Sequence, residues 1–266
     1  MMKKNKFIKE LYLRYLSINI KSIMVYDIDY LVGIIAMIIK SVVNFCLLLI
    51  LFQLVDNING WTFNEMLFLY GFSEISYALW HCCFIDTITI PTYIQTGEFD
   101  RFLTKPVNPL FQIMMEAFDE DGWGELFFGI IIMIISIVRL NLFSWKLLLL
   151  PFMCIAACLI FASMSIICSS VAFYTIGNID LTDNVMDFKE FAKYPMSIFN
   201  STLQIVFTCI LPIGFTAYYP SLMFLRNTGI NTIVISLITI PVAIVFFILS
   251  CKWWNFSLKK YNSSGY

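Results

Sequence analysis

The stretch LVGIIAMIIKSVVNFCLLLILFQL, residues 31–54, carries only one charged side chain, that of Lys40. About 20 consecutive apolar residues are enough for an α-helix to cross the ~30 Å hydrocarbon core of a bilayer. Residues 31–54 are therefore predicted to form a transmembrane helix. Comparable apolar runs recur along the chain, and we expect six spans, at about 31–54, 62–85, 126–142, 145–172, 198–218 and 230–251.

The composition agrees with a chain that is mostly surrounded by lipid. Hydrophobic residues make up 60% of the 266 positions and charged residues 13%, against about 45–50% and about 25% in soluble domains. The expected fold class is an all-α integral membrane protein. We expect one transmembrane domain over residues 1–266, with a surface segment at 1–28, the spans within 31–251 and a tail at 252–266.

The segment before the first span has a different pattern. Between Phe7 and Met24, apolar residues recur at near-helical spacing and are interleaved with Lys9, Arg14 and Lys21. This pattern predicts a basic amphipathic helix on the membrane surface. No small-residue cleavage site follows, so we expect the first span to be retained rather than removed as a signal peptide.

The positive charges predict the orientation. If the N-terminus lies inside, the inner segments hold most of the 17 Lys and Arg residues. The outer loops then hold only Arg139, Lys146 and Arg226. This bias favours cytoplasmic termini and two cytoplasmic loops, at 86–125 and 173–197. The acidic part of the second loop, Asp180–Glu190, is interpreted as a solvated connector.

Several functions are excluded by what the sequence lacks. With a net charge of -1 there is no basic field for nucleic acid, and no partner of that kind is expected. The chain has no GxxxxGK loop, no HExxH and no GxSxG, and His81 is its single histidine. Eight cysteines form no CxxC pair, so we expect buried thiols rather than disulfides or a metal site. No catalytic group is assigned, and any ATP hydrolysis must come from another chain.

Two charges fall within the predicted spans. Lys40 and Glu74 come at similar depths of the first two spans, about 12–14 Å from the inner face at ~1.5 Å per residue. We therefore predict that they form an ion pair, although Lys40 could instead extend to the inner interface. Tyr70, Tyr77 and His81 share a helix face with Glu74. This polar stripe either lines a pathway or holds the first two helices together.

The first predicted cytoplasmic loop contains YIQTGEFDRFLTKPVNPLFQIMMEAF, residues 93–118. Gly97 frees the backbone, charges of both signs follow, and Pro106 and Pro109 prevent a helix from continuing. The composition alone is compatible with a solvated connector. It also fits a short charged helix that ends at the prolines.

A family resemblance favours the second interpretation. The loop resembles the G-E-x-D-R/x-x-L…P-x-N-P-L stretch of permease subunits from type-2 ATP-binding cassette (ABC) exporters, in a six-helix subgroup. Three further stretches resemble the same family: NGWTFNEMLFLYG (59–71), YPMSIFNSTLQIVFTCILPIGFTAYYPSLMFL (194–225) and the tail WWNFSLKKYNSSG (253–265), with Trp253, Tyr261, Ser263 or Ser264, and Gly265 in its closing pattern. The likeness therefore extends over the whole fold.

The resemblance implies an exporter subunit in the bacterial plasma membrane, embedded in lipid and paired with a second permease, either a copy or a related chain. Two separate ABC ATPase subunits would carry ATP and magnesium, and this chain would bind no cofactor. The residues of the implied coupling helix are Gly97, Glu98, Phe99, Asp100, Arg101, Phe102, Leu103, Lys105 and Pro106. We expect Phe99, Phe102 and Leu103 to anchor it on the ATPase. The N-terminal helix would be the interfacial elbow of the family.

The sequence departs from the family pattern in two places. Lys105 stands where arginine is expected, which keeps the charge but loses the bidentate fork. The acidic run of Glu116, Asp119, Glu120 and Asp121 matches nothing in the family.

Two other classes of protein compete with the exporter. In a lipid-modifying intramembrane enzyme, Glu74, His81 and Asp86 would be the acid–base group. The third alternative is a passive channel. Purification together with an ATPase would favour the exporter over both.

Overall fold

The computed structural model describes residues 27–116, 121–175, 179–226 and 229–262, together with Arg14, Ser17 and Lys21. These parts of the chain are helical and contain no strand beyond one isolated bridge, between Ile58 and Trp61. The all-α membrane fold class is thus confirmed. Apart from those three residues, the predicted surface helix at 7–24 lies outside the described residues, as do Asp119, Glu120, Ser263, Ser264 and Gly265.

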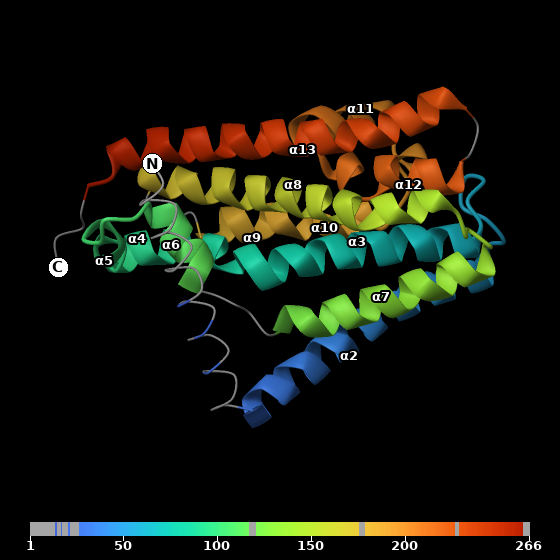
Figure 1. Ribbon diagram of the computed structural model, residues 1–266, viewed down its shortest axis with the longest axis horizontal. Helices are drawn as coiled ribbons and strands as arrows, with labels where there is room; N and C mark the ends of the chain where they lie inside the picture. Colours follow the sequence, from blue (N-terminus) through green and yellow to red (C-terminus); the bar gives the residue numbers. More distant parts are fainter. Residues whose placement is uncertain are drawn as a thin grey trace.

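Five long helices make up the bundle. They are α2 (Asp27–Leu54), α3 (Phe63–Phe84), α7 (Asp121–Arg139), α8 (Leu150–Ser170) and α13 (Ile230–Ser257). In Figure 1, α3, α8 and α13 run along the long axis of the molecule, whereas α2 is inclined to them. Four stretches are long and apolar enough to cross a membrane: Tyr30–Leu54, Gly122–Arg139, Trp145–Phe173 and Ile230–Lys260. They coincide with the first, third, fourth and sixth predicted spans.

Helix α3 is the centre of the bundle, with α7, α8 and α12 (Tyr218–Leu225) packed around it. It begins where the backbone N–H of Thr62 donates to the carboxylate of Glu65, one half of a capping box. Gly71 and Gly129 bring α3 and α7 into contact, because a Cβ on Gly71 would lie 2.9 Å from the backbone nitrogen of Met133. The second predicted span is therefore a buried helix rather than one that faces lipid.

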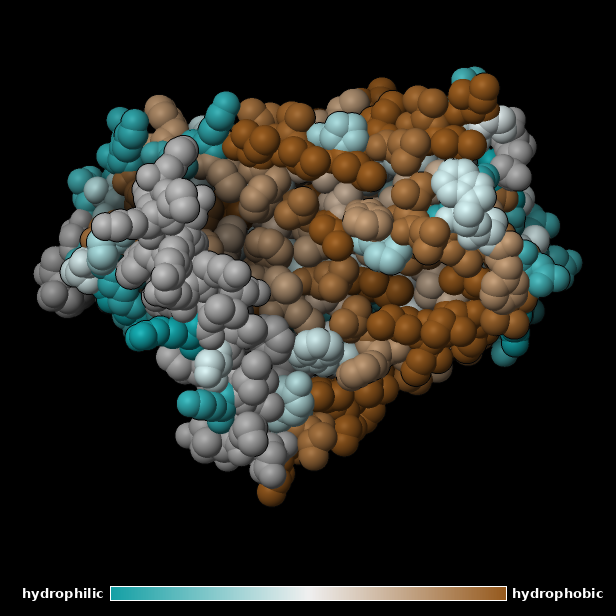
Figure 2. All heavy atoms as spheres, viewed as in Figure 1, coloured by the Kyte–Doolittle hydropathy of each residue, from teal (hydrophilic) through white to brown (hydrophobic). Residues whose placement is uncertain are grey.

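The short helices within residues 85–116 gather at one end of the bundle. The 3-10 turn η1 (Ile85–Thr89) leads into α4 (Ile90–Thr96), α5 (Asp100–Leu103) and α6 (Pro109–Glu116). The last turn of α13 and η7 (Leu258–Lys260) lie at this same end (Figure 1). We call it the tail end, and the end that carries residues 55–62 the opposite end. In Figure 2 the surface between the two ends is a broad apolar band.

The fifth predicted span, at 198–218, is wrong, and so is the predicted cytoplasmic loop at 173–197. The chain leaves the tail end through α9 (Ile179–Asp187) and α10 (Lys189–Ala192), which pack against α8 and α3. It reaches the opposite end at Ser197, whose carbonyl accepts a hydrogen bond from the Asn59 side chain. Residues 179–197 therefore run along the bundle from the tail end to the opposite end, where a solvated loop was expected.

Residues 201–225 fold back on themselves as a hairpin. Its elements are α11 (Ser201–Ile205), the π turn η5 (Val206–Ile210), η6 (Ile213–Thr216) and α12. The hydroxyl groups of Thr208 and Tyr219 lie 2.9 Å apart and join the two arms. The apolar run at 198–218 does not form one continuous helix, because Pro212 divides it. The charged residues that precede the run are paired inside the bundle, as described below.

Candidate functional site

A short helix, α5, forms within the predicted coupling segment, and aromatic side chains fix it to the bundle. Gly97 ends α4 with a left-handed φ of 76°, a conformation that favours glycine. The α5 helix follows at once. Phe99 and Phe102 are fully buried, and the ring of Phe99 lies 6.1 Å from that of Trp254 and 5.4 Å from that of Phe173.

Polar contacts complete this attachment. The Tyr261 hydroxyl donates to Asp100 at 2.8 Å. The buried Gln112 amide donates to the carbonyls of Phe102 and Val107, at 2.9 and 2.8 Å. Residues from the 93–118 motif and from the tail motif therefore touch each other, although they are about 160 positions apart. The two motifs are thus parts of one cluster, which we call the tail-end cluster.

Two of the three predicted ATPase anchors are wrong. Phe99 and Phe102 point into the tail-end cluster, since a short helix beside a bundle buries its largest apolar side chains first. Leu103 is 43% exposed. Glu98, Lys105 and Pro106 are exposed as well. The outward face of the motif is therefore Leu103 with the charged residues around it.

One residue of the unassigned acidic run has a place in this region. The Arg101 guanidinium donates to Glu116 at 2.9 Å, and it lies over the rings of Tyr93 and Phe102. Lys105 is 4.0 Å from the same carboxylate. Glu116 therefore neutralises the basic side of α5. The family pattern gave no sign of this contact because Glu116 lies beyond the prolines.

A second group of charges lies in the middle of the bundle, where α3, α7 and α10 meet. Lys193 is 3.0 Å from Glu74 and 2.9 Å from Glu190. Lys193 and Glu74 are both buried. We call the group of Glu74, His81, Glu125, Lys189 and Lys193, with the exposed Glu190 at its edge, the buried charge network.

The other half of the network is centred on Glu125 of α7. This buried carboxylate accepts from His81 at 3.1 Å and lies 4.0 Å from Lys189. The Lys189 ammonium also lies 3.4 Å from the centre of the Tyr77 ring, a cation–π contact. The cleft lined by Ser73, Glu74, Tyr77, Lys189 and Lys193 has no room for a water molecule. Direct contacts must therefore satisfy these charges.

The predicted ion pair between Lys40 and Glu74 is wrong. Glu74 pairs with Lys193, while Lys40 is half exposed and lies 4.0 Å from Glu125. The expected neighbour was wrong because α2 packs chiefly along α7. Lys193 was missed because it was assigned to a solvated loop. One signal in the sequence could have identified Lys193. It is a basic residue that lies three or four positions from an acidic one and next to an apolar run.

The polar stripe on α3 connects several helices. The Tyr70 hydroxyl donates to the Ser41 carbonyl of α2 at 3.3 Å. Tyr77 and Glu74 face α10, and His81 faces α7. The stripe holds α3 to three neighbours rather than only to the first span. Glu74 and His81 engage different partners, Lys193 and Glu125 respectively.

Cysteine chemistry adds nothing to these sites. All eight cysteines are free thiols. Among the described residues, no group of three or more His, Cys, Asp and Glu side chains could hold a metal ion.

Together, a bundle of membrane-crossing helices with a short helical segment attached at one end defines a polytopic membrane protein. The sequence model of a protein family described as "ABC-2 family transporter protein" matches residues 38–265. This chain therefore belongs to the ABC-2 transporter family and is a membrane transport subunit. Searches among curated proteins and among solved structures gave no match.

Proposed function

We propose that this chain is the transmembrane subunit of an ATP-driven exporter, which moves a substrate outward across the bacterial plasma membrane. It works with a second permease, either a copy or a related chain, and with two ABC ATPase subunits that bind ATP and magnesium. Membership of the ABC-2 family supports the transport role. The observation that carries the proposal is the α5 segment, which is rigidly attached on one side and exposed on the other.

The attachment of α5 gives a route for force. Phe99 contacts Phe173, which follows α8, and Trp254, which belongs to α13. A push on Leu103 or Lys105 is therefore transmitted to the ends of two membrane-crossing helices. A solvated connector would lack such an attachment, since its charges would serve only to keep it in water.

The test uses two exposed positions of α5 and its following turn. Leu103→Asp combined with Lys105→Glu leaves the buried contacts in place, so the protein should still insert and fold. We expect a tagged parent chain to co-purify from its native membranes with an ATPase bearing a GxxxxGK motif, and the double variant to lose that protein. Gln95→Asp, an exposed change on α4, is the matched control. Co-purification of the ATPase with both variants alike would reject the coupling role.

The acidic face of α9 and α10 supports a pathway between two permeases. Asp180, Asp183, Asp187 and Glu190 are exposed and follow each other at spacings of three, four and three, which puts them on one helical face. Carboxylates at membrane depth avoid lipid and face protein or water. We propose that this face turns toward the second permease and borders a hydrated path.

The orientation is also a proposal, with the tail end in the cytoplasm. Single cysteines are introduced at Asn57, which lies at the opposite end, and at Thr104, which lies next to α5, after the native cysteines have been replaced. A membrane-impermeant maleimide added to intact cells should label Asn57→Cys and spare Thr104→Cys. Labelling of Thr104→Cys alone would reverse the orientation.

A further inference from the structure

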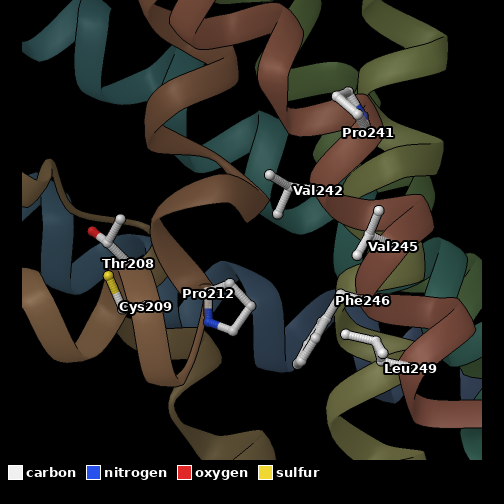
Figure 3. A pocket seen from close by; sticks show the side chains of 8 residues that line it. All are labelled: Thr208, Cys209, Pro212, Pro241, Val242, Val245, Phe246 and Leu249. Atoms are coloured by element: carbon white, nitrogen blue, oxygen red, sulfur yellow. The ribbon is translucent and has the colours of Figure 1, made fainter.

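A groove separates the π turn η5 and Pro212, in the first arm of the hairpin, from α13. It is lined by Thr208, Cys209, Pro212, Pro241, Val242, Val245, Phe246 and Leu249 (Figure 3). Its volume is about 370 Å³, which lies within the ~300–1,000 Å³ typical of ligand pockets. One side is open to the surroundings of the protein, so a ligand can enter laterally without unfolding either wall.

The shape of the groove comes from local backbone irregularities on both walls. On the hairpin, the Leu211 N–H bonds the Val206 carbonyl at 2.9 Å, which closes the wide π turn, and Pro212 ends it. On α13, Pro241 has no N–H to bond the preceding turn, and its ring crowds that turn. The two segments therefore cannot pack together as two regular helices do.

The lining is suited to a hydrocarbon. Its side-chain polar atoms are the Thr208 hydroxyl and the Cys209 thiol. The hydroxyl is already bonded to that of Tyr219. No charged side chain lines the groove. A charged or strongly polar group placed there would lose its hydration without gaining a partner, whereas an alkyl chain would lose nothing.

The source of that alkyl chain follows from the surroundings. The groove opens onto the exposed apolar face of α13, where Ile244, Val245, Ile248 and Leu249 are about half exposed. This face belongs to a stretch long and apolar enough to cross a membrane. The groove is thus continuous with the lipid-facing surface of the protein, and the neighbouring molecules are phospholipids.

We propose that the groove is a binding site for one acyl chain of a membrane phospholipid. The bound chain fills the space that the π turn and the two prolines leave open, and so completes the packing of the hairpin against α13. This lipid stays with the protein and is not the transported substrate. The proposal needs only the membrane location and holds whether or not the exporter mechanism is right.

The experiment maps contacts of a phosphatidylglycerol that carries a photoreactive diazirine on one acyl chain. The parent protein is reconstituted with this lipid, irradiated and analysed by peptide mass spectrometry. We expect crosslinks to concentrate at Cys209, Val242 and Val245, at least tenfold above Ile238, Ile244 and Ile248 on the open face of α13. An even distribution over the two groups would overturn the proposal, since it would describe ordinary bulk lipid.

Two variants refine the test. Val242→Trp places an indole in the groove and should reduce crosslinking at Cys209 at least tenfold, whereas Ile244→Trp, on the same helix but outside the groove, should leave it unchanged. Equal effects of the two variants would reject the site.

Protection of Cys209 by an added second permease would instead identify a contact between chains. Release of the lipid during ATP-driven turnover would identify a substrate. Either result would show that the proposal is wrong.

Discussion

The tail-end cluster and the buried charge network each hold a short helix in place, but by opposite kinds of contact. Aromatic rings hold α5 at the end of the bundle, around Phe99 and Trp254. Opposite charges hold α10 in the middle, around Lys193 and Glu125. Where the bundle meets water, apolar packing can attach a helix to it. In the dry interior, a few charges provide both attachment and orientation.

The largest effect should come from breaking the network. Lys193→Ala leaves Glu74 buried without its partner, and loss of one member of a buried pair costs about 3–5 kcal/mol. The free energy of unfolding in detergent should fall by that amount. Lys105→Ala, which removes an exposed lysine, should change it by less than about 0.5 kcal/mol.

A double variant sharpens this prediction. Glu74→Gln with Lys193→Met removes both charges and should be more stable than Lys193→Ala, because no unpaired charge remains buried. If the double variant is the less stable of the two, the pair does not act as a buried ion pair.

The next largest effect is expected from substitutions that distinguish the two faces of α5. Phe99→Ala removes a fully buried ring and should lower the free energy of unfolding by about 3 kcal/mol. Leu103→Ala removes an exposed side chain and should leave it within about 0.5 kcal/mol. Thermal unfolding in detergent measures both. Similar losses for the two variants would contradict the assignment of an attached face and an outward face.

The smallest effect concerns the hydrogen bond between the two motifs. Tyr261→Phe removes the donor to Asp100 and should cost about 1.5 kcal/mol, at the low end of the range for a hydrogen bond to a charged group. In a double-mutant cycle with Asp100→Asn, the two changes should be less than additive. Simple additivity would mean that the two side chains do not interact in the folded protein.

The features that could be predicted from the sequence are those that depend on a local pattern of residues. Runs such as 31–54 and 230–251 became helices because an apolar helix in lipid needs no particular neighbour. The 97–106 segment was identified through its resemblance to a family motif, because Gly97 and Pro106 bound the segment but are equally compatible with a solvated connector. Lys193 could not be assigned this way, because its charge resembles that of a cytoplasmic loop until Glu74 is known to lie beside it. Phe99 was misassigned for a related reason, since residue type does not say which side of a short helix is covered.

The contact between Gly71 and the α7 backbone has a consequence for how α10 can move. Because α3 and α7 touch there and at Gly129, the carboxylates of Glu74 and Glu125 keep a constant separation. Lys189 and Lys193 lie one turn apart on α10, so each faces one of these carboxylates in the same rotational setting of the helix. A rotation of α10 large enough to release one lysine also withdraws the other. A transport step that rotated α10 would therefore have to break both contacts together rather than one after the other.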